Sequence, residues 1–166
     1  MRKLIPLAVA VAALSFTAVA VAVPGHFNQG QGQTCTFDGT NTDTDLQNEE
    51  VTCSGTISGL GNEPVEVFVV INTRAGCSNP GNDDIPGQRR FVSPGFTPDQ
   101  NGSVDYTVTG AINCHGNQVA FIQSPVDLEA YACTSGRPRF NKDGDQTNDA
   151  CNGAFDTVDN VPVSNF

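Results

Sequence analysis

The sequence lacks tryptophan and has two histidines, and its eight basic residues face eighteen acidic ones. The scarcity of histidine and the absence of any C-x-x-C pair argue against a zinc site. The formal net charge of −10 excludes nucleic acid as a natural partner, because the phosphate backbone attracts positively charged proteins. No stretch has a capped amphipathic helical stripe of about ten residues, which argues against a helical fold.

The N-terminal segment has the layout of a secretory signal. Arg2 and Lys3 precede a long uncharged run rich in Ala, Val and Leu, and small residues follow where a signal peptidase acts. We predict a signal peptide over residues 1–22, cleaved after Ala20 or Ala22, rather than a retained membrane anchor. Cleavage removes two basic and no acidic residues, so the formal charge of the secreted, extracellular product falls from −10 to −12. No stable membrane insertion is expected after cleavage.

Six cysteines follow the predicted signal peptide, and an even number in an exported chain indicates three disulfides. The alternative, a metal site, lacks both the spacing and the histidines. Six cysteines allow 15 pairings, and we expect the sequential one, because each bond then closes a short loop that joins neighbouring strands or holds a long connection. The cysteines are Cys35, Cys53, Cys77, Cys114, Cys133 and Cys151.

The apolar residues alternate with polar ones, which is typical of strands with one buried face. This alternation is clear in residues 51–58 and again in 65–71, where Phe68 and Val70 are also apolar and indicate a central strand covered on both faces. Between the two lies the turn sequence Gly59-Leu60-Gly61-Asn62, so we expect the pair to form a hairpin.

Further alternating stretches predict an all-β fold. They include residues 104–109, 119–123 and 126–133, the last two separated by Pro125. Their spacing predicts a single antiparallel β-sandwich of about seven strands, stapled by disulfides, over residues 35–166. Residues 23–34, which are rich in Gly and Gln, are expected to be a flexible N-terminal lead-in.

Asp127, Tyr131 and Cys133 have the spacing D-x-x-x-Y-x-C, which resembles the tyrosine corner of immunoglobulin domains. The resemblance implies an immunoglobulin-like sandwich. The absence of tryptophan counts against it, and period-two alternation alone also places Tyr131 and Cys133 on one face of a strand.

Three short motifs resemble a group of small exported bacterial β-rich proteins of uncharacterised function. They are C-S-G-T-I-S-G-L-G-N at 53–62, C-S-N-P-G at 77–81 and P-G-Q at 86–88, and the match extends over about residues 51–132. The resemblance implies export and a β-rich fold. It supplies no catalytic residues.

The best candidate metal site lies in the last polar loop. Counted from Asn141, its residues with side-chain oxygen atoms fall at positions 1, 3, 5 and 9. This spacing directs several oxygen ligands to one calcium ion. The segment 141–151, which ends in Asp-x-Cys, is similar to a thrombospondin type 3 calcium loop. The alternative is a solvated acidic loop held by Cys151, because Gln146 stands where such loops have Gly. The candidate calcium ligands are Asn141, Asp143, Asp145 and Asp149.

Arginine dominates the few cations of the secreted part, which has a single lysine. Guanidinium groups bind carboxylate or sulfate through two parallel hydrogen bonds, so these residues are candidates for binding an extracellular acidic polymer or the acidic face of a second copy. The alternative is ordinary salt bridging on an acidic surface. The candidates are Arg89, Arg90, Arg137 and Arg139.

Catalytic motifs are scarce. No G-x-S-x-G elbow is present, and the most specific enzyme hypothesis is a copper-dependent oxygenase in which an N-terminal His26 and His115 bind the metal. The sequence therefore favours a secreted, non-catalytic binding or structural protein of the cell surface or extracellular matrix, with calcium as a candidate stabiliser. A small secreted enzyme is the alternative.

Overall fold

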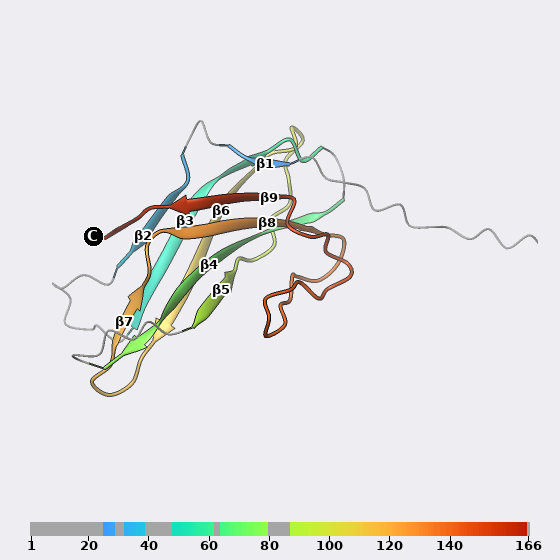
Figure 1. Ribbon diagram of the computed structural model, residues 1–166. Coiled ribbons are helices and arrows are strands. Elements are labelled where there is room, and N and C mark those ends of the chain that lie inside the picture. Colours follow the sequence, from blue (N-terminus) through green and yellow to red (C-terminus); the bar gives the residue numbers. More distant parts are fainter. Residues whose placement is uncertain (1–24, 29–31, 39–47, 62–63, 80–86, 166) are drawn as a thin grey trace, which may run out of the picture.

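The structure is a computed structural model that describes residues 25–28, 32–38, 48–61, 64–79 and 87–165 (Figure 1). These residues form ten strands and no helix, in two five-stranded sheets. The first sheet contains β1 (His26–Phe27), β2 (Thr34–Phe37), β3 (Asn48–Ser58), β6 (Val104–Asn113) and β10 (Val163–Asn165). The second contains β4 (Glu66–Ser78), β5 (Gln88–Val92), β7 (Val119–Ile122), β8 (Val126–Cys133) and β9 (Asp156–Val161).

The long strand β3 organises the first sheet. One edge of β3 pairs with β6 along ten residues, and the opposite edge pairs with β2 and then with the two-residue β1. The last strand, β10, joins the outer edge of β2 and runs parallel to it. The other strand pairs are antiparallel, so the expected antiparallel arrangement has one exception among the described strands.

The long strand β4 organises the second sheet in the same way. One edge of β4 pairs with β8 over Glu66–Asn72 and with β7 over Ala75–Ser78, while β5 takes the other edge and β9 extends the sheet beyond β8. The break predicted at Pro125 is confirmed, because this residue lies between β7 and β8 and follows a cis peptide bond.

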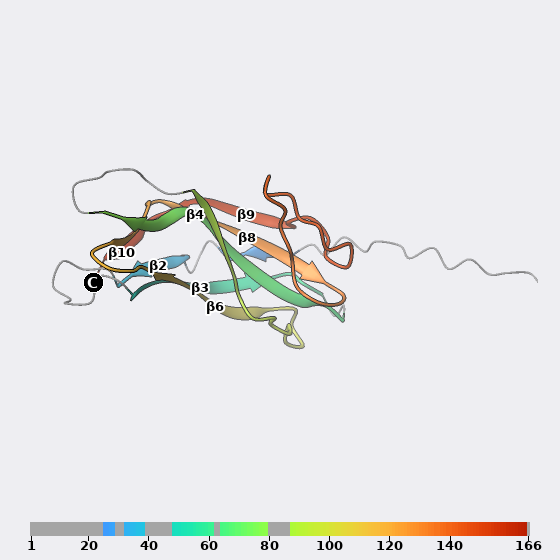
Figure 2. The same ribbon diagram turned by 90° about the horizontal axis from the view of Figure 1, so that it is seen from below.

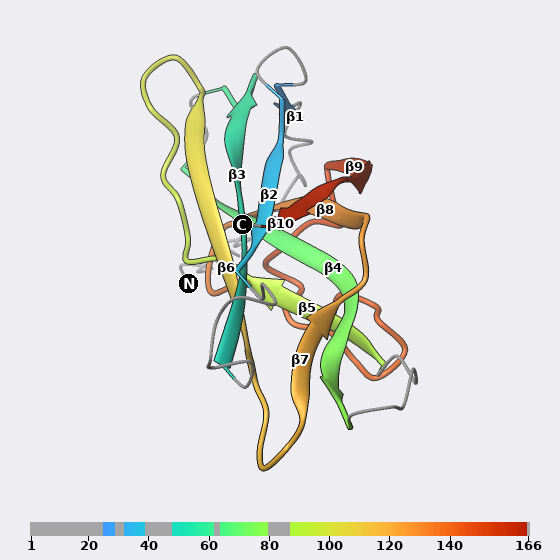
Figure 3. The same ribbon diagram turned by 90° about the vertical axis from the view of Figure 1, so that its left-hand side faces the viewer.

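The two sheets form two layers that enclose the main core (Figure 2). Figure 3 shows strands of the second sheet running across those of the first. Alternate residues of β4, namely Val67, Val69 and Ile71, point into this core and are fully buried. Burial of each such side chain stabilises the fold by about 1.5–3 kcal/mol. Phe68 and Val70 lie in a second cluster on the outer face of the sheet, which confirms that this strand is covered on both faces.

Three disulfides link the strands in the expected sequential order. Cys35–Cys53 joins opposite residues of β2 and β3. Cys77–Cys114 connects the end of β4 to the residue that follows β6, and so ties the second sheet to the first. Cys133–Cys151 joins the end of β8 to the loop that follows it.

The hairpin predicted between residues 51–58 and 65–71 is wrong. The two stretches belong to β3 and β4, which lie in different sheets. Leu60 explains the difference, because it is fully buried in the main core and its backbone N–H donates to the Gly102 carbonyl at 2.9 Å. Gly59 and Gly61 both have positive φ, which lets the chain turn tightly around this anchor.

The segment expected to be a flexible lead-in contains β1. Phe27 in this strand is 1 % exposed and belongs to the main core, and its ring meets Tyr106 edge-on at 5.7 Å between centroids. One apolar anchor in a Gly/Gln-rich segment thus suffices to fix two residues against β3. Short strands such as β1 and β10 account for the excess over the seven strands that were expected.

The predicted signal peptide lies outside the described residues, and no described helix is long and apolar enough to cross a membrane.

Candidate functional site

The outer face of the second sheet is covered by the connection between β8 and β9, residues 134–155, which we call the cover loop. It is the orange to red loop at the right of Figure 1. Cys133–Cys151 fixes its base, and Phe140 packs against the outer cluster formed by Phe68, Val70, Tyr131 and the two cysteines. Backbone hydrogen bonds from Asn152 to Ala132 and from Phe155 to Ala130 return the chain to the sheet.

The tip of the cover loop is a tight turn held together by Asn141. Phe140 and Gln146 form an isolated β-bridge on either side of it. The Asn141 side-chain oxygen accepts the backbone N–H groups of Asp143 and Asp145, both at 2.9 Å, and its amide donates to the Asp145 carboxylate at 3.0 Å. Asn141 is therefore a turn-stabilising residue that uses its polar atoms within the loop.

Three of the four candidate calcium ligands contact other groups of this turn. Asn141 and Asp145 bind each other, Asp143 lies 3.4 Å from the Lys142 ammonium, and no group of three acidic, histidine or cysteine side chains that suits a metal occurs among the described residues. The guanidinium of Arg90 packs against Gly144, which places a positive charge where a calcium ion would be repelled. The spacing of positions 1, 3 and 5 thus coincides with contacts within a tight turn, and calcium binding at these residues stays a prediction.

Replacing Asn141 with alanine is expected to lower the free energy of unfolding by about 1 kcal/mol, because two backbone N–H groups lose their acceptor. The loss should be the same with calcium and with a chelator in urea unfolding curves. Asp149→Ala is the matched control, since Asp149 is exposed and makes none of these contacts. A calcium-dependent rise in stability that disappears in Asp149→Ala would restore the calcium site.

Beside the cover loop lies a groove of about 780 Å³ that we call the arginine groove. It occurs where β5 of the second sheet approaches β6 of the first, and the cover loop forms its third side. Cationic and apolar side chains share its lining. The lining residues are Arg90, Phe91, Val92, Thr109, Arg137, Pro138, Arg139 and Phe140.

Close contact between β5 and β6 depends on a glycine. A methyl group added to Gly110 would overlap the Phe91 ring, so only glycine lets Phe91 lie across β6. Phe91 is partly buried and packs against the main core. The floor of the groove is therefore a firm part of the fold.

Arg90 is the most constrained of the cationic residues in the groove. Its guanidinium lies over the Phe140 ring, 5.1 Å from the centroid, a cation–π contact that restrains the orientation of both side chains. Its buried Nε has no hydrogen-bond partner among the described residues. A buried donor without an acceptor costs about 1–3 kcal/mol, so among the described residues the contact with Phe140 is what holds this guanidinium in place.

Arg137 and Arg139 form the opposite wall. Both are exposed and flank the buried Pro138. The Asn148 amide donates to the Arg137 carbonyl at 2.9 Å, and the Thr147 backbone N–H donates to the Arg139 carbonyl at 2.7 Å. None of the three groove arginines makes an ion pair with an acidic side chain in the part of the chain that the structure describes.

The fourth predicted arginine is separated from the other three. Arg89 lies opposite Thr73 of β4 and Arg90 opposite Asn72, and neighbouring residues of a strand point to opposite faces. Arg89 is exposed and does not line the groove. The structure thus brings three of the four predicted arginines to one groove, and Arg89 serves below as a control.

Tyr131 supports the cover loop from beneath. Its ring meets Phe140 edge-on at 5.6 Å between centroids, and its hydroxyl donates to the Glu129 carboxylate. Burial raises the pKa of Tyr131 above its usual value, and the hydrogen bond and negative charge of Glu129 add to the effect. The pKa of Tyr106 is raised as well, by burial in the main core.

The two histidines are not brought together. His26 pairs with Ser58 at one end of β3, whereas Asn113, which precedes His115 by two residues, pairs with Asn48 at the other end. The two register positions are separated by roughly 33 Å at about 3.3 Å per residue. The copper centre considered as the basis of an enzyme is therefore not formed by these residues.

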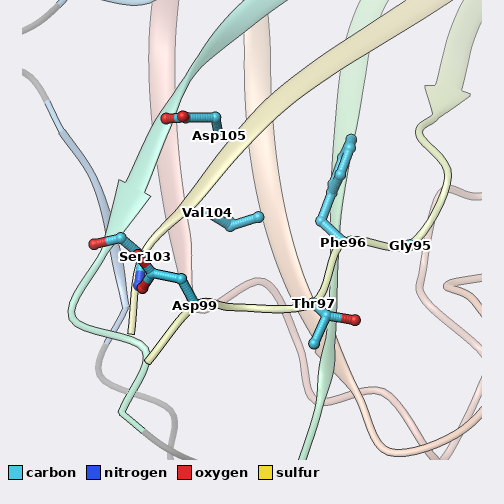
Figure 4. Close-up of a pocket in the computed structure, with 7 residues that line it drawn as sticks. All are labelled: Gly95, Phe96, Thr97, Asp99, Ser103, Val104 and Asp105. Carbon is cyan, nitrogen blue, oxygen red and sulfur yellow. The ribbon is translucent and has the colours of Figure 1, made fainter. Parts of the chain in front are cut away.

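A second hollow of about 430 Å³ surrounds Asp99 (Figure 4). Figure 4 shows Asp99 beside Ser103, with Val104 pointing toward Phe96. The Asp99 carboxylate accepts the backbone N–H groups of Asn101 and Ser103 at 2.9 and 2.8 Å. The N–H of Ser103 is the largest cause of the lowered pKa of Asp99. Asp99 therefore stabilises a turn.

Comparisons with protein-family models, curated proteins and solved structures found no significant match to this chain. The assignment of a candidate functional site is therefore argued from the geometry of the structure alone. The sequence pointed to the arginines but not to Phe91, Thr109 or Phe140, because these come from three separate segments whose proximity is a property of the folded chain.

Proposed function

We propose that this chain is an exported, non-catalytic binding protein of the cell surface or extracellular matrix, with an immunoglobulin-like sandwich as its scaffold, and that it holds an anionic part of its ligand in the arginine groove. Three disulfides support export, because such bonds persist in oxidising compartments. The corner spacing of Asp127, Tyr131 and Cys133 supports the immunoglobulin-like part of the proposal.

One observation supports the ligand assignment above all others. Arg90, Arg137 and Arg139 converge on one groove in a chain whose eighteen acidic residues outnumber its basic ones. Gathering like charges costs free energy unless counter-charges are present, and acidic partners are abundant elsewhere on this surface. Arginines that line one groove without forming ion pairs among the described residues are suited to an anion from outside the chain.

The test is equilibrium binding of an inorganic polyphosphate, a polyanion with no apolar surface, to the folded protein by calorimetry. Arg90→Gln, Arg137→Gln and Arg139→Gln are each expected to weaken binding by about tenfold, because a charge-assisted hydrogen bond contributes about 1.5–3 kcal/mol. Arg89→Gln removes the same charge from the same strand outside the groove and should change the affinity less than about twofold. Equal losses for Arg89→Gln and Arg90→Gln, or no binding at all, would refute the proposal.

A further inference from the structure

We propose that the ligand of the arginine groove is an acidic polysaccharide, bound with its carboxylate or sulfate groups on the guanidinium groups and the C–H face of a sugar ring on the apolar floor. This inference rests on the proposed function and narrows it from anions in general to one class of polymer. It is supported by the mixture of lining residues, by the orientation of Arg90, and by the spacing of Arg137 and Arg139.

Half of the lining residues are apolar. Phe91, Val92, Pro138 and Phe140 share the groove with the three arginines and Thr109. A small inorganic anion would leave this apolar surface in contact with water, whereas binding sites generally cover such surface with a matching part of the ligand. A sugar ring has C–H groups on its faces and hydroxyl or acidic groups at its rim, so it matches the floor and the walls together.

The orientation of Arg90 determines which kind of anion fits. Phe140 covers one face of its guanidinium, and the buried Nε remains without an acceptor. Gly144 also packs against the guanidinium, so the N–H groups that point away from Phe140 and Gly144 are the ones left for a ligand. Planar carboxylates and the oxygen pairs of sulfate accept two parallel hydrogen bonds from such N–H groups.

The opposite wall indicates more than one negative charge on the ligand. Arg137 precedes a proline and is thereby restricted to extended backbone. Arg137 and Arg139 are two residues apart, and both line the groove. Arg137 and Arg139, which flank the buried Pro138, thus present two charges in a row, as a polymer with one acid per repeating unit requires.

An acidic peptide fits this arrangement less well. Each glutamate holds its carboxylate on a flexible side chain, and fixing such a chain costs up to about 2 kcal/mol of rotamer entropy. In an acidic sugar the carboxylate or sulfate is attached at or next to the ring, so one rigid group reaches guanidinium and floor at a smaller entropic cost. The remote acidic residues of the protein do not prevent this contact, because at physiological ionic strength charges are screened within about 8 Å.

The experiment compares three polymers of equal charge number on the full secreted chain: an oligouronate, a poly-glutamate and the inorganic polyphosphate used above. The oligouronate is expected to bind at least about tenfold more tightly than either of the others. A sulfated oligosaccharide of the same length distinguishes carboxylate from sulfate as the preferred group, and tight binding of either supports the class. Poly-glutamate or polyphosphate binding as tightly as both sugars overturns this inference but leaves the anion-binding function intact.

The variant Phe140→Leu separates the contribution of the aromatic ring of Phe140 to binding from the contribution of the charged groups. Leucine keeps most of the volume against Tyr131 but removes the aromatic face under Arg90. Both affinities should fall, because Arg90 loses the ring that orients it, but the loss for oligouronate should be about fivefold larger than the loss for polyphosphate. Equal losses of affinity for both polymers would contradict the packing of a sugar ring against the apolar side chains of the groove. If no polymer binds in a manner that depends on Arg90, the proposed function itself fails.

Discussion

Replacing Cys77 and Cys114 with alanine is expected to lower the free energy of unfolding by about 4 kcal/mol, the largest loss among the three disulfides. The two cysteines are 37 residues apart in sequence, whereas the other pairs are each 18 apart. A longer closed loop removes more conformations from the unfolded chain, and the same estimate for the shorter loops is about 3 kcal/mol. Cys77–Cys114 is also the bond that ties the second sheet to the first.

Urea unfolding of the two double-alanine variants, Cys77→Ala/Cys114→Ala and Cys35→Ala/Cys53→Ala, measures this difference under non-reducing conditions. The second variant is a matched control, because it removes a disulfide within the first sheet and leaves the sheets connected. A Cys77→Ala/Cys114→Ala variant as stable as the control would show that the link between the sheets adds nothing beyond packing.

Raising the pH above about 10 is expected to destabilise the folded protein progressively, because both of its tyrosines are buried with raised pKa values. The unfolded chain ionises tyrosine near its ordinary pKa of about 10, while the folded chain keeps the proton. The stabilisation is therefore fully present below pH 10 and is lost as the pH rises toward the folded pKa values. Ionised Tyr131 can no longer donate to Glu129, so the cover loop should lose its support in the same range.

Phenolate absorbance measures the ionisation of the tyrosines directly, since Tyr106 and Tyr131 are the only tyrosines and tryptophan is absent. Ionisation should coincide with loss of the β-sheet circular dichroism signal. The variant Tyr106→Phe keeps the ring against Phe27 and removes one ionising group, so its alkaline transition should move to higher pH. Phenolate formation near pH 10 in a chain that stays folded would contradict the burial argument.

The sequence correctly predicted the features that depend on residues close together in the chain. The period-two alternation in 51–58 correctly assigned Val51, Cys53 and Ile57 to a buried face, because side-chain direction in a strand depends only on position parity. The even number of cysteines and their spacing led to the correct sequential pairing. The same parity places Arg89 and Arg90 on opposite faces of β5, although the two residues carry the same charge.

Partners distant in sequence were not predictable in this way. A turn sequence does not say whether the next strand pairs with the last one or crosses to another sheet, and only the burial of Leu60 decides the matter here. The arginine groove joins residues 90–92, 109 and 137–140, whose meeting depends on the close approach of β5 to β6 at Gly110. Oxygen spacing in 141–149 likewise did not reveal that Asn141 turns its side chain toward its own backbone.

The parallel pairing of β2 with β10 has a mechanical consequence. Cys35–Phe37 near the beginning of the described chain lies alongside Val163–Asn165 at its end, in the same direction. A pull on the two chain ends therefore slides these strands along each other, so their hydrogen bonds are stretched together and not opened one at a time. Cys35–Cys53 passes the force on to β3. The parallel pairing of β2 with β10 therefore resists tension that is applied at the two ends of the described domain.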